Sequence, residues 1–212
     1  MDGGGNGSVV TIPSSTATVT LSELTIQNGQ AEYGGGVANN GTLTVNNSTI
    51  SGNSASYRGG SDGNGGGIWN DGTLTLNNTT FSGNRASYHG GGIFGTATIQ
   101  NSIVANSSLG GNCWGTMTSE GYNLSDDNTC NFNGPGDLND TKAKLGKLGN
   151  HGGPTQTIPE ALDSPTVDAG NPSGCTDSQG HLLTTDQRGY PRPGAHKHDK
   201  RCDMGAYERQ TD

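Results

Sequence analysis

The sequence predicts an all-β fold, a right-handed parallel β-helix, on two observations. A glycine-rich passage recurs at residues 34–53, 65–84 and 90–106, with a degenerate copy at 17–29. Each copy alternates apolar and polar residues with a period of two, which is typical of β-strands. Because one copy cannot bury its apolar face alone, the copies must stack as the coils of a solenoid. Right-handed winding is the default, since crossovers between parallel strands have that hand in nearly all proteins.

Each coil is expected to contain three short strands. In the pattern GTLTV of the longest strand, Leu43 and Val45 point inward and the intervening threonines point outward. A second strand follows two polar residues later, and a third follows the triple glycine directly. Their inward residues are Ile26, Ile50, Phe81 and Val104 in the second strand and Val37, Ile68 and Ile93 in the third. The longest coil carries an insertion, Arg58–Asn64, which must bulge from one corner.

Stacking of similar coils brings like residues into columns along the axis. A column of asparagines is expected to form an amide ladder at a turn, and a column of tyrosines is expected to stack. Structural roles are favoured over ligand binding for both columns. The asparagines are Asn28, Asn53, Asn84 and Asn106, and the tyrosines are Tyr33, Tyr57 and Tyr88. Two further columns consist of outward threonines, namely Thr18, Thr20, Thr42, Thr44, Thr73, Thr75, Thr96 and Thr98.

The threonine columns admit two interpretations. Coils lie about 4.8 Å apart and alternate residues of a strand about 6.7 Å apart, so the methyl and hydroxyl groups form a grid. This grid is similar to the Thr-x-Thr arrays of ice-binding β-solenoids. Threonine also has a high β-propensity and stacks well on an exposed sheet. The second interpretation is favoured, and ice binding through the array is the alternative.

The repeat ends after residue 106, and three regions are expected. They are the β-helix coils at 1–106, a disulfide-containing continuation of the solenoid at 107–147 and an irregular C-terminal cap at 148–212. A cap is expected because a solenoid must protect its open end from edge-to-edge association.

The four cysteines favour disulfides over a zinc site, because none of them lies in a CxxC pair. They are Cys113, Cys130, Cys175 and Cys202. Four cysteines allow three connectivities, of which the local one keeps each bridge within its own segment. An even cysteine count in a glycine- and asparagine-rich chain favours an oxidising compartment.

The repeats and the C-terminal motifs resemble bacterial surface proteins. The GGGI-x-N-x-GTLTL-x-NST-x-SGN pattern resembles the right-handed β-helix repeats of these proteins, including the polymorphic outer-membrane protein type. The segments LGNHGGPTQT, DSPTVDAGNP, TDQRGYPRP and CDMGAYE resemble the choice-of-anchor Q domain. The resemblance implies a secreted or surface-displayed β-helix whose chain often ends in a sorting or anchoring segment. The family has no catalytic residues to carry over.

The charged residues of the C-terminal motifs are expected to form a buried network of hydrogen bonds and ion pairs that locks the cap. They are Asp168, Asp186, Arg188, Asp203 and Glu208. Calcium on these acids is an alternative, because carboxylates are hard oxygen ligands, although the spacing is not diagnostic. No cofactor is expected.

A polysaccharide lyase or hydrolase is the enzymatic alternative, because many right-handed β-helices catalyse such reactions. The chemistry needs clustered carboxylates, and a lyase also needs a basic proton acceptor. The strand faces offer Glu23 as their lone acid. The charged residues that could converge at a corner are Arg58, Asp62, Arg85 and His89. Since no paired carboxylates are evident, solvated loop charges are the favoured interpretation and no catalysis is expected.

A metal site is a further alternative near Cys202. His196 and His198 place two imidazoles on one strand face, with Asp199 and Asp203 close in sequence. Without a supporting ligand set, a basic solvated loop is the favoured interpretation. No bound metal is expected.

Charge and hydropathy narrow the class of partner. The net charge of -8 argues against nucleic acid and anionic membranes. No stretch approaches the about 18 consecutive apolar residues of a membrane span. The sequence therefore favours a non-catalytic structural or adhesive module at the bacterial exterior, secreted or on the cell surface. Its expected partner is a surface glycan, a protein or another copy of the chain, and end-to-end or lateral assembly into a filament belongs to this hypothesis.

Overall fold

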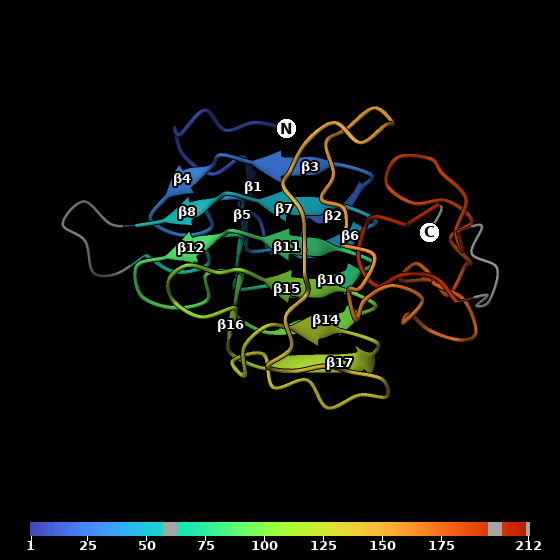
Figure 1. The fold of residues 1–212 in the computed structure, drawn as a ribbon. Coiled ribbons are helices and arrows are strands. Elements are labelled where there is room, and N and C mark those ends of the chain that lie inside the picture. The colour runs from blue at the N-terminus through green and yellow to red at the C-terminus, as the bar shows by residue number, and fades with distance from the viewer. Residues whose placement is uncertain (57–62, 195–200, 211–212) are drawn as a thin grey trace.

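The computed structural model describes residues 1–56, 63–194 and 201–210. In these residues the regular secondary structure consists of eighteen short strands and includes no helix. The strands pair in parallel into four sheets that run along one axis (Figure 1). The strands nearest the viewer in Figure 1 run leftwards while the coils descend, which is a right-handed winding. The predicted parallel β-helix is confirmed.

The four sheets differ in their outward residues, in their length and in whether the C-terminal segment covers them. The threonine sheet consists of β2 (Thr18–Ser22), β6 (Thr42–Asn46), β10 (Thr73–Asn77), β14 (Ala97–Gln100) and β17 (Met117–Gly121). The covered sheet, which lies under the C-terminal segment, consists of β3 (Thr25–Gln27), β7 (Thr49–Ser51), β11 (Thr80–Ser82), β15 (Ile103–Ala105) and β18 (Leu124–Ser125). The aromatic sheet consists of β1 (Val10–Ile12), β5 (Val37–Asn39), β9 (Ile68–Asn70), β13 (Ile93–Phe94) and β16 (Cys113–Trp114). The short sheet consists of β4 (Gln30–Ala31), β8 (Ser54–Ala55) and β12 (Arg85–Ala86).

The register places apolar residues of successive coils on one another. Ile50 of β7 pairs with Ile26 of β3 and with Phe81 of β11, and all three are fully buried. The column predicted for the third strand is buried as well and consists of Val37, Ile68 and Ile93. These columns belong to one continuous hydrophobic core. Each fully buried aliphatic or aromatic side chain contributes roughly 1.5–3 kcal/mol, so stacking supplies the burial that a single coil lacks.

The recurring triple glycine is required by the corner before the aromatic sheet. Its first residue adopts a left-handed conformation in each coil, with φ of 64° at Gly34, 68° at Gly65 and 63° at Gly90. Its last residue lies where coils approach closely, because a Cβ on Gly67 would lie 2.5 Å from the carbonyl oxygen of Gly92. Glycine is the residue that satisfies both demands without strain or a clash.

A fifth coil follows the recognisable repeats. Its strands β16, β17 and β18 pair with β13, β14 and β15 of the coil before it. The disulfide between Cys113 and Cys130 lies in this region, and both residues are buried in the main core. The second disulfide joins Cys175 to Cys202. The local connectivity is therefore the one that the structure adopts.

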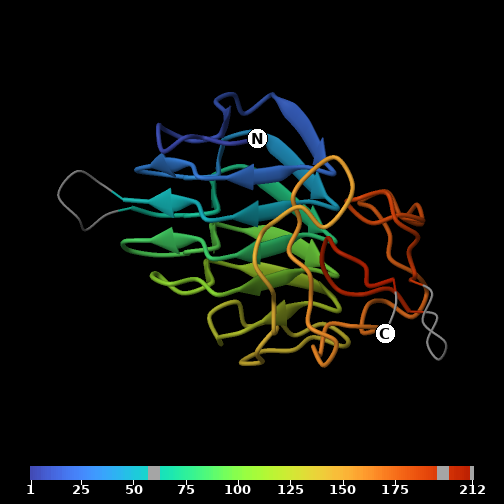
Figure 2. The ribbon, with the colours of Figure 1, turned by 45° about the horizontal axis from the view of Figure 1, so that its top comes forward.

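The C-terminal segment, residues 148–194 and 201–210, runs along the side of the β-helix (Figure 2). Thr25 of β3 donates a hydrogen bond to the carbonyl of Gln156, and Thr49 of β7 donates one to the side chain of Gln187. One coil further along, Thr80 of β11 accepts a hydrogen bond from a backbone amide of the segment. The irregular, disulfide-stabilised segment thus covers the flank of the coils, whereas a cap over the open end was the reason for expecting it.

The outer strands of the covered and short sheets have other partners. At the first coil, Asp2 bridges to Gln27 and Gly7 bridges to Gln30. At the last coil, Leu124 bridges to Leu138. Residues next to the coils in sequence thus pair with edge strands that would otherwise be templates for association.

Candidate functional site

The threonine sheet presents two columns of threonines on its outward face. The predicted threonines are exposed at Thr18, Thr20, Thr73 and Thr96 and partly exposed at Thr42, Thr44, Thr75 and Thr98. Register pairing joins Thr44 to Thr20 and Thr75, and Thr75 to Thr98. The structure therefore places all eight on one outward face, which the C-terminal segment leaves uncovered.

The fifth coil adds two threonines that the sequence analysis missed. Thr118 pairs with Thr98 in the register of β17 and β14. Thr118 and Thr116 are both exposed. The signal was the segment GTMT at residues 115–118, which matches GTLT but lacks the flanking glycine triplet and asparagine pair of the repeats. The array therefore contains ten threonines over five coils.

The predicted ladder of four asparagines is wrong, because Asn28 and Asn106 lie one residue before the position that Asn53 and Asn84 occupy in their coils. Asn53 and Asn84 are buried, and the backbone and side-chain amides of Asn53 each donate to Oδ1 of Asn84 at 3.0 Å. Asn28 and Asn106 instead occupy the preceding turn position, where φ is 56° and 58°. The middle coils have glycine at that position with φ of 67° and 69°. Glycine adopts this left-handed conformation readily and asparagine tolerates it, so the turn geometry decides the alignment.

Other amide pairs stabilise the remaining turns. The donor and acceptor side chains lie 2.6 Å apart in the pair Asn39 with Asn70 and 3.0 Å apart in the pair Asn77 with Asn46. A third pair joins Asn101 to Asn78 at 2.6 Å. These pairs satisfy buried amides that would otherwise cost stability.

The predicted tyrosine column does not stack on itself. Tyr33 packs against Trp69 with ring centroids 5.8 Å apart, and Tyr88 packs against His89 at 3.8 Å. The bridges pair Tyr33 with Asn64 and Asn64 with His89, so Tyr88 lies one position off the column. Tyr57, the third member, lies outside the described residues.

The aromatic sheet carries a row of rings on its outward face. Phe94 of β13 pairs in register with Trp69 of β9 and with Trp114 of β16. His89 stacks on Trp114 with ring centroids 3.7 Å apart and planes inclined by 10°. The sequence signal was present, because these outward rings follow directly on the inward residues of GGGIW, GGGIF and NCW.

The C-terminal segment is locked by the predicted network of charged residues. The backbone amide of Asp168 donates to Asp203 at 2.6 Å, and that of Asp203 donates to Glu208 at 2.9 Å. The amide of Glu208 donates in turn to Asp186, which forms an ion pair of 2.6 Å with Arg188. All five predicted residues are therefore connected through one chain of contacts.

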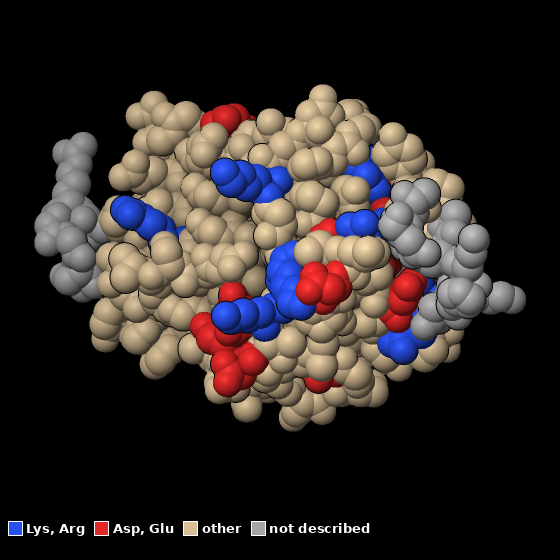
Figure 3. All heavy atoms as spheres, in the orientation of Figure 1, with Lys and Arg blue, Asp and Glu red and all other residues tan. Residues whose placement is uncertain are grey.

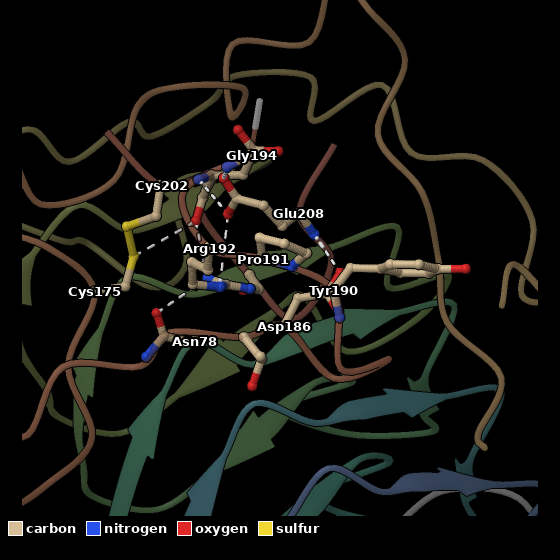
Figure 4. A network of polar contacts seen from close by, with 12 residues as sticks. Asn78, Cys175, Asp186, Tyr190, Pro191, Arg192, Gly194, Cys202 and Glu208 are labelled. Atoms are coloured by element: carbon tan, nitrogen blue, oxygen red, sulfur yellow. Dashed lines mark hydrogen bonds and ion pairs between the residues drawn. A yellow bond between two sulfur atoms is a disulfide. The ribbon is translucent and has the colours of Figure 1, made fainter. Parts of the chain in front are cut away.

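Arg192, which the sequence analysis did not include, links this network to the coils (Figure 4). Its side chain is fully buried and lies 3.6 Å from Glu208. It donates to the carbonyl of Asp203 at 3.2 Å and to the side chain of Asn78 at 3.3 Å. A buried guanidinium needs such a set of acceptors because its isolated burial is costly.

Burial raises the pKa values of two acids of this network, Glu208 and Asp203, and of Glu160, which Asp203 influences. Removal from water is the largest cause for each. It raises the pKa of Glu208 to about 7 despite the nearby Arg192 guanidinium. It raises the pKa of Asp203, and it raises that of Glu160 well above the usual range, with the Asp203 carboxylate adding to the effect. The network therefore holds more protons than free carboxyl groups would at neutral pH.

The residues weighed as catalytic do not form one cluster in the described chain. Arg85 donates from Nε to the hydroxyl of Ser54, while His89 belongs to the aromatic row. Arg58 and Asp62 lie outside the described residues. Glu23 is exposed at a turn on the covered side, where its carbonyl accepts a hydrogen bond from Thr155.

Of the residues weighed as metal ligands, Asp203 lies in the described part of the chain. Asp203 accepts backbone amide hydrogen bonds at both carboxylate oxygens, from Asp168 and Arg209. His196, His198 and Asp199 lie outside the described residues. In the part of the chain that is described, no group of three or more His, Cys, Asp or Glu side chains could hold a metal ion.

Charged side chains are unevenly distributed over the face that carries the C-terminal segment (Figure 3). On the face shown in Figure 3, lysines, arginines and acids lie mostly over the C-terminal segment and the lower coils. The threonine and aromatic rows themselves consist of uncharged residues and one histidine. They are therefore the candidate binding faces of the molecule.

No family model, curated protein or solved structure significantly matches the chain. The resemblance to bacterial surface proteins therefore stays a prediction, while the β-helix that it implies is confirmed. None of the described residues belongs to a helix that is long and apolar enough to span a membrane. The two disulfides are typical of proteins from extracellular, oxidising environments.

Proposed function

We propose that this chain is a non-catalytic extracellular module with a structural and adhesive role, and that it attaches to extended, regular surfaces through its threonine sheet. The observation that carries this proposal is the register of eight outward threonines over five coils, which Thr96 and Thr116, exposed just before β14 and β17, extend to ten. The resemblance to surface-displayed bacterial β-helices and the two disulfides support secretion or surface display.

The threonine face has the physical properties that adhesion to a regular surface needs. Hydrogen bonds between coils fix the spacing in one direction, and the strand backbone fixes it in the other. Threonine is branched at Cβ, so few rotamers are lost when its methyl and hydroxyl groups are immobilised on binding. Candidate surfaces are a glycan, a protein array and the same face of a second copy.

Ice binding is the second candidate function, and the fifth coil favours it. Thr116 and Thr118 extend the two-column grid by one row beyond the four that the sequence predicted. A longer rigid array of methyl and hydroxyl groups can order more water in a lattice spacing. The threonine face would then bind ice instead of a glycan or protein surface.

The test is to block the centre of the array with bulky side chains. The double variant Thr44→Tyr, Thr75→Tyr alters two threonines that pair in register. Ser178→Tyr, at an exposed position on the C-terminal segment, is the matched control. Retention is measured on isolated bacterial cell walls and on growing ice, and self-association is measured by sedimentation velocity over a concentration series.

We expect the wild type and the control to be retained on cell walls or to self-associate, with at least a tenfold loss in the double variant. If the double variant behaves like the wild type, or if the wild type neither adheres nor associates, the adhesive proposal is wrong. Retention on ice alone, abolished in the double variant, would replace it with the second candidate.

A further inference from the structure

The aromatic sheet gathers the tryptophans of the chain on one outward face. The sequence contains two tryptophans, Trp69 and Trp114. They flank Phe94 in register, so three large rings occupy consecutive coils at the same outward position. Outward positions on an exposed strand do not need aromatic residues for stability, because the facing inward residues already fill the core.

Three more rings widen this row. Tyr33 lies beside Trp69, and His89 and Tyr88 lie beside Trp114. Trp114 is 49% exposed, Tyr88 56% and Tyr33 41%, so three of the exposed large hydrophobic side chains of the described chain lie along this row. A contiguous exposed patch of this kind marks an interaction site more often than scattered surface residues do.

A groove of about 760 Å³ lies at the Trp114 end of the row. It is lined by the rings of Tyr88, His89 and Trp114, by Cys113, Thr116 and Thr129, and by glycines 110, 111 and 115. No acidic, lysine or arginine side chain belongs to this lining. The groove thus combines open ring surface with hydroxyl and backbone polar groups, and its lining contains no carboxylate, ammonium or guanidinium group.

We propose that this aromatic groove binds a neutral polysaccharide built of hexopyranose units. The C–H faces of a pyranose stack on aromatic rings, while its hydroxyls hydrogen-bond to threonine, tyrosine and backbone groups of the kind that line the groove. The spacing of about 4.8 Å between coils is close to the length of one hexopyranose in an extended chain, so consecutive rings can meet consecutive sugars.

The net charge of the chain and the lining of the groove favour a neutral glycan over an anionic or a cationic ligand. The chain has a net charge of -8, which disfavours polyanionic polymers such as uronic acid chains. A cationic ligand would be expected to find a carboxylate in the groove, and the lining contains none. A purely apolar partner would leave the polar lining groups without hydrogen bonds.

This inference deepens the proposed adhesive function by assigning a ligand class to a second face, and the two can fail separately. The threonine face is tested by Thr44→Tyr with Thr75→Tyr, which alters a different sheet. The aromatic groove is tested by glycan binding in solution, which requires neither a solid surface nor self-association.

Intrinsic fluorescence reports on the proposed site directly, because Trp114 lines the groove and Trp69 lies further along the same row of rings. Trp69→Phe leaves Trp114 as the single tryptophan, and this variant is titrated with hexasaccharides of β-1,4-glucose, β-1,3-glucose and β-1,4-mannose. Oligogalacturonate serves as the anionic comparison. We expect a saturable change in Trp114 emission with at least one neutral glucan or mannan, and at least tenfold weaker binding of oligogalacturonate.

The variant Trp114→Ala is expected to reduce affinity at least tenfold when binding is measured by calorimetry. Trp114→Phe keeps a ring and is expected to retain most of the affinity, which separates stacking from a loss of structure. The threonine double variant should bind the glycan like the wild type. Absence of binding to every neutral glycan of the panel, or unchanged affinity in Trp114→Ala, would overturn the inference.

Discussion

The covered sheet and the threonine sheet are built by the same coils, yet equivalent polar residues have opposite environments on them. Thr49 and Thr80 on the covered sheet are fully buried, and Thr25 is 3% exposed. On the threonine sheet, Thr20 is exposed and Thr44 partly exposed. On the covered sheet β3, β7 and β11 each begin with a threonine, and on the threonine sheet β2, β6 and β10 do. Exposure of an outward threonine is therefore decided by a segment more than one hundred residues away along the chain.

The C-terminal segment selects the covered sheet because its polar groups match the polar groups there. Gln187 accepts a hydrogen bond from Thr49 at 2.6 Å and donates to Thr25 at 3.1 Å. It donates further to the carbonyl of Gln156 at 3.1 Å. One buried amide thus connects two coils with the segment that covers them. The segment contacts the threonine sheet at the end of β14, where Thr176 donates to the side chain of Gln100 at 3.2 Å. The threonine columns themselves stay exposed or partly exposed, which leaves them available for binding.

The largest effect is expected from removal of Arg192. Arg192→Met leaves the carboxylate of Glu208 and the carbonyl of Asp203 without their buried cation. Breaking a buried pair in this way costs about 3–5 kcal/mol. We expect a lower unfolding temperature and early proteolytic release of the C-terminal segment, measured by calorimetry and limited trypsin digestion.

Arg85→Met is the matched control for this variant. Arg85 is exposed and donates one hydrogen bond to Ser54. Surface interactions of this kind contribute about 0–1 kcal/mol. If the two variants lose the same stability, the network does not hold the segment on the covered sheet.

The second-largest loss of stability is expected from removal of the disulfide within the C-terminal segment. Replacing Cys175 and Cys202 by alanine opens a loop with a sequence separation of 27. Loop-closure entropy predicts a loss of about 3.5 kcal/mol. Because the bridge lies within the covering segment, we expect hydrogen exchange to increase at Thr49 and Thr80 while the amides of β6 and β10 keep their protection. Uniform loss of protection on both sheets would show that the segment and the coils unfold as one unit.

The periodic part of the fold was predictable from the sequence because its determinants are local. Alternation in strands such as β6 fixes which side chains point inward, and the glycine triplet fixes the corners. The asparagine ladder was misaligned because it was based on residue identity. The aligned feature is the left-handed turn, at which Asn28 corresponds to Gly52. The row of Trp69, Phe94 and Trp114 has a signal in the sequence, but its significance depends on the register across coils of unequal length.

The course of the C-terminal segment could not be predicted in this way. Its charged residues were recognisable as a network, since they lie in distinctive motifs such as TDQRGYPRP. Which face they cover depends on complementarity between distant groups, as in the hydrogen bond of Ala206 to Thr80. Arg192 lies in the same motif, and its importance follows from the acceptors Asn78 and Gly205, which only the folded chain brings together.

The third prediction is a decrease in stability as the pH rises through neutrality. Folded Glu208 has a pKa of about 7, above its ordinary value of 4.5, so the folded state binds more protons than the unfolded state between these values. The stabilisation is complete below about pH 4.5 and is lost as the pH rises through 7. Each pKa unit corresponds to about 1.4 kcal/mol, so the free energy of unfolding should fall by up to about 3 kcal/mol. Thermal unfolding between pH 5 and 8 measures this.

Glu160→Gln separates the network from other titrating groups. Burial raises the pKa of Glu160 well above its usual range, and glutamine imitates the neutral acid at every pH. The variant should match the wild type at pH 5 and lose less stability towards pH 8. Below pH 4 the sign reverses at Asp127. Partial burial raises the pKa of this group, but hydrogen bonds from Thr129, Asn112 and Ser125 together outweigh burial and lower it, so its stabilising contribution is lost on protonation. A stability that stays constant or rises from pH 5 to 8 would contradict the assignment.

The smallest expected change in the free energy of unfolding comes from removing one hydroxyl on each of the two sheets within a single coil. Thr49→Val and Thr44→Val remove the same hydroxyl and keep the branched shape, on the covered and the threonine sheet respectively. Thr49→Val leaves the side-chain oxygen of Gln187 without its 2.6 Å donor and should cost about 1–2 kcal/mol. Thr44→Val should change the free energy of unfolding by less than about 0.5 kcal/mol, because its hydroxyl is accessible to water. Chemical denaturation resolves the difference, and equal losses would mean that the covering segment does not distinguish the two faces energetically.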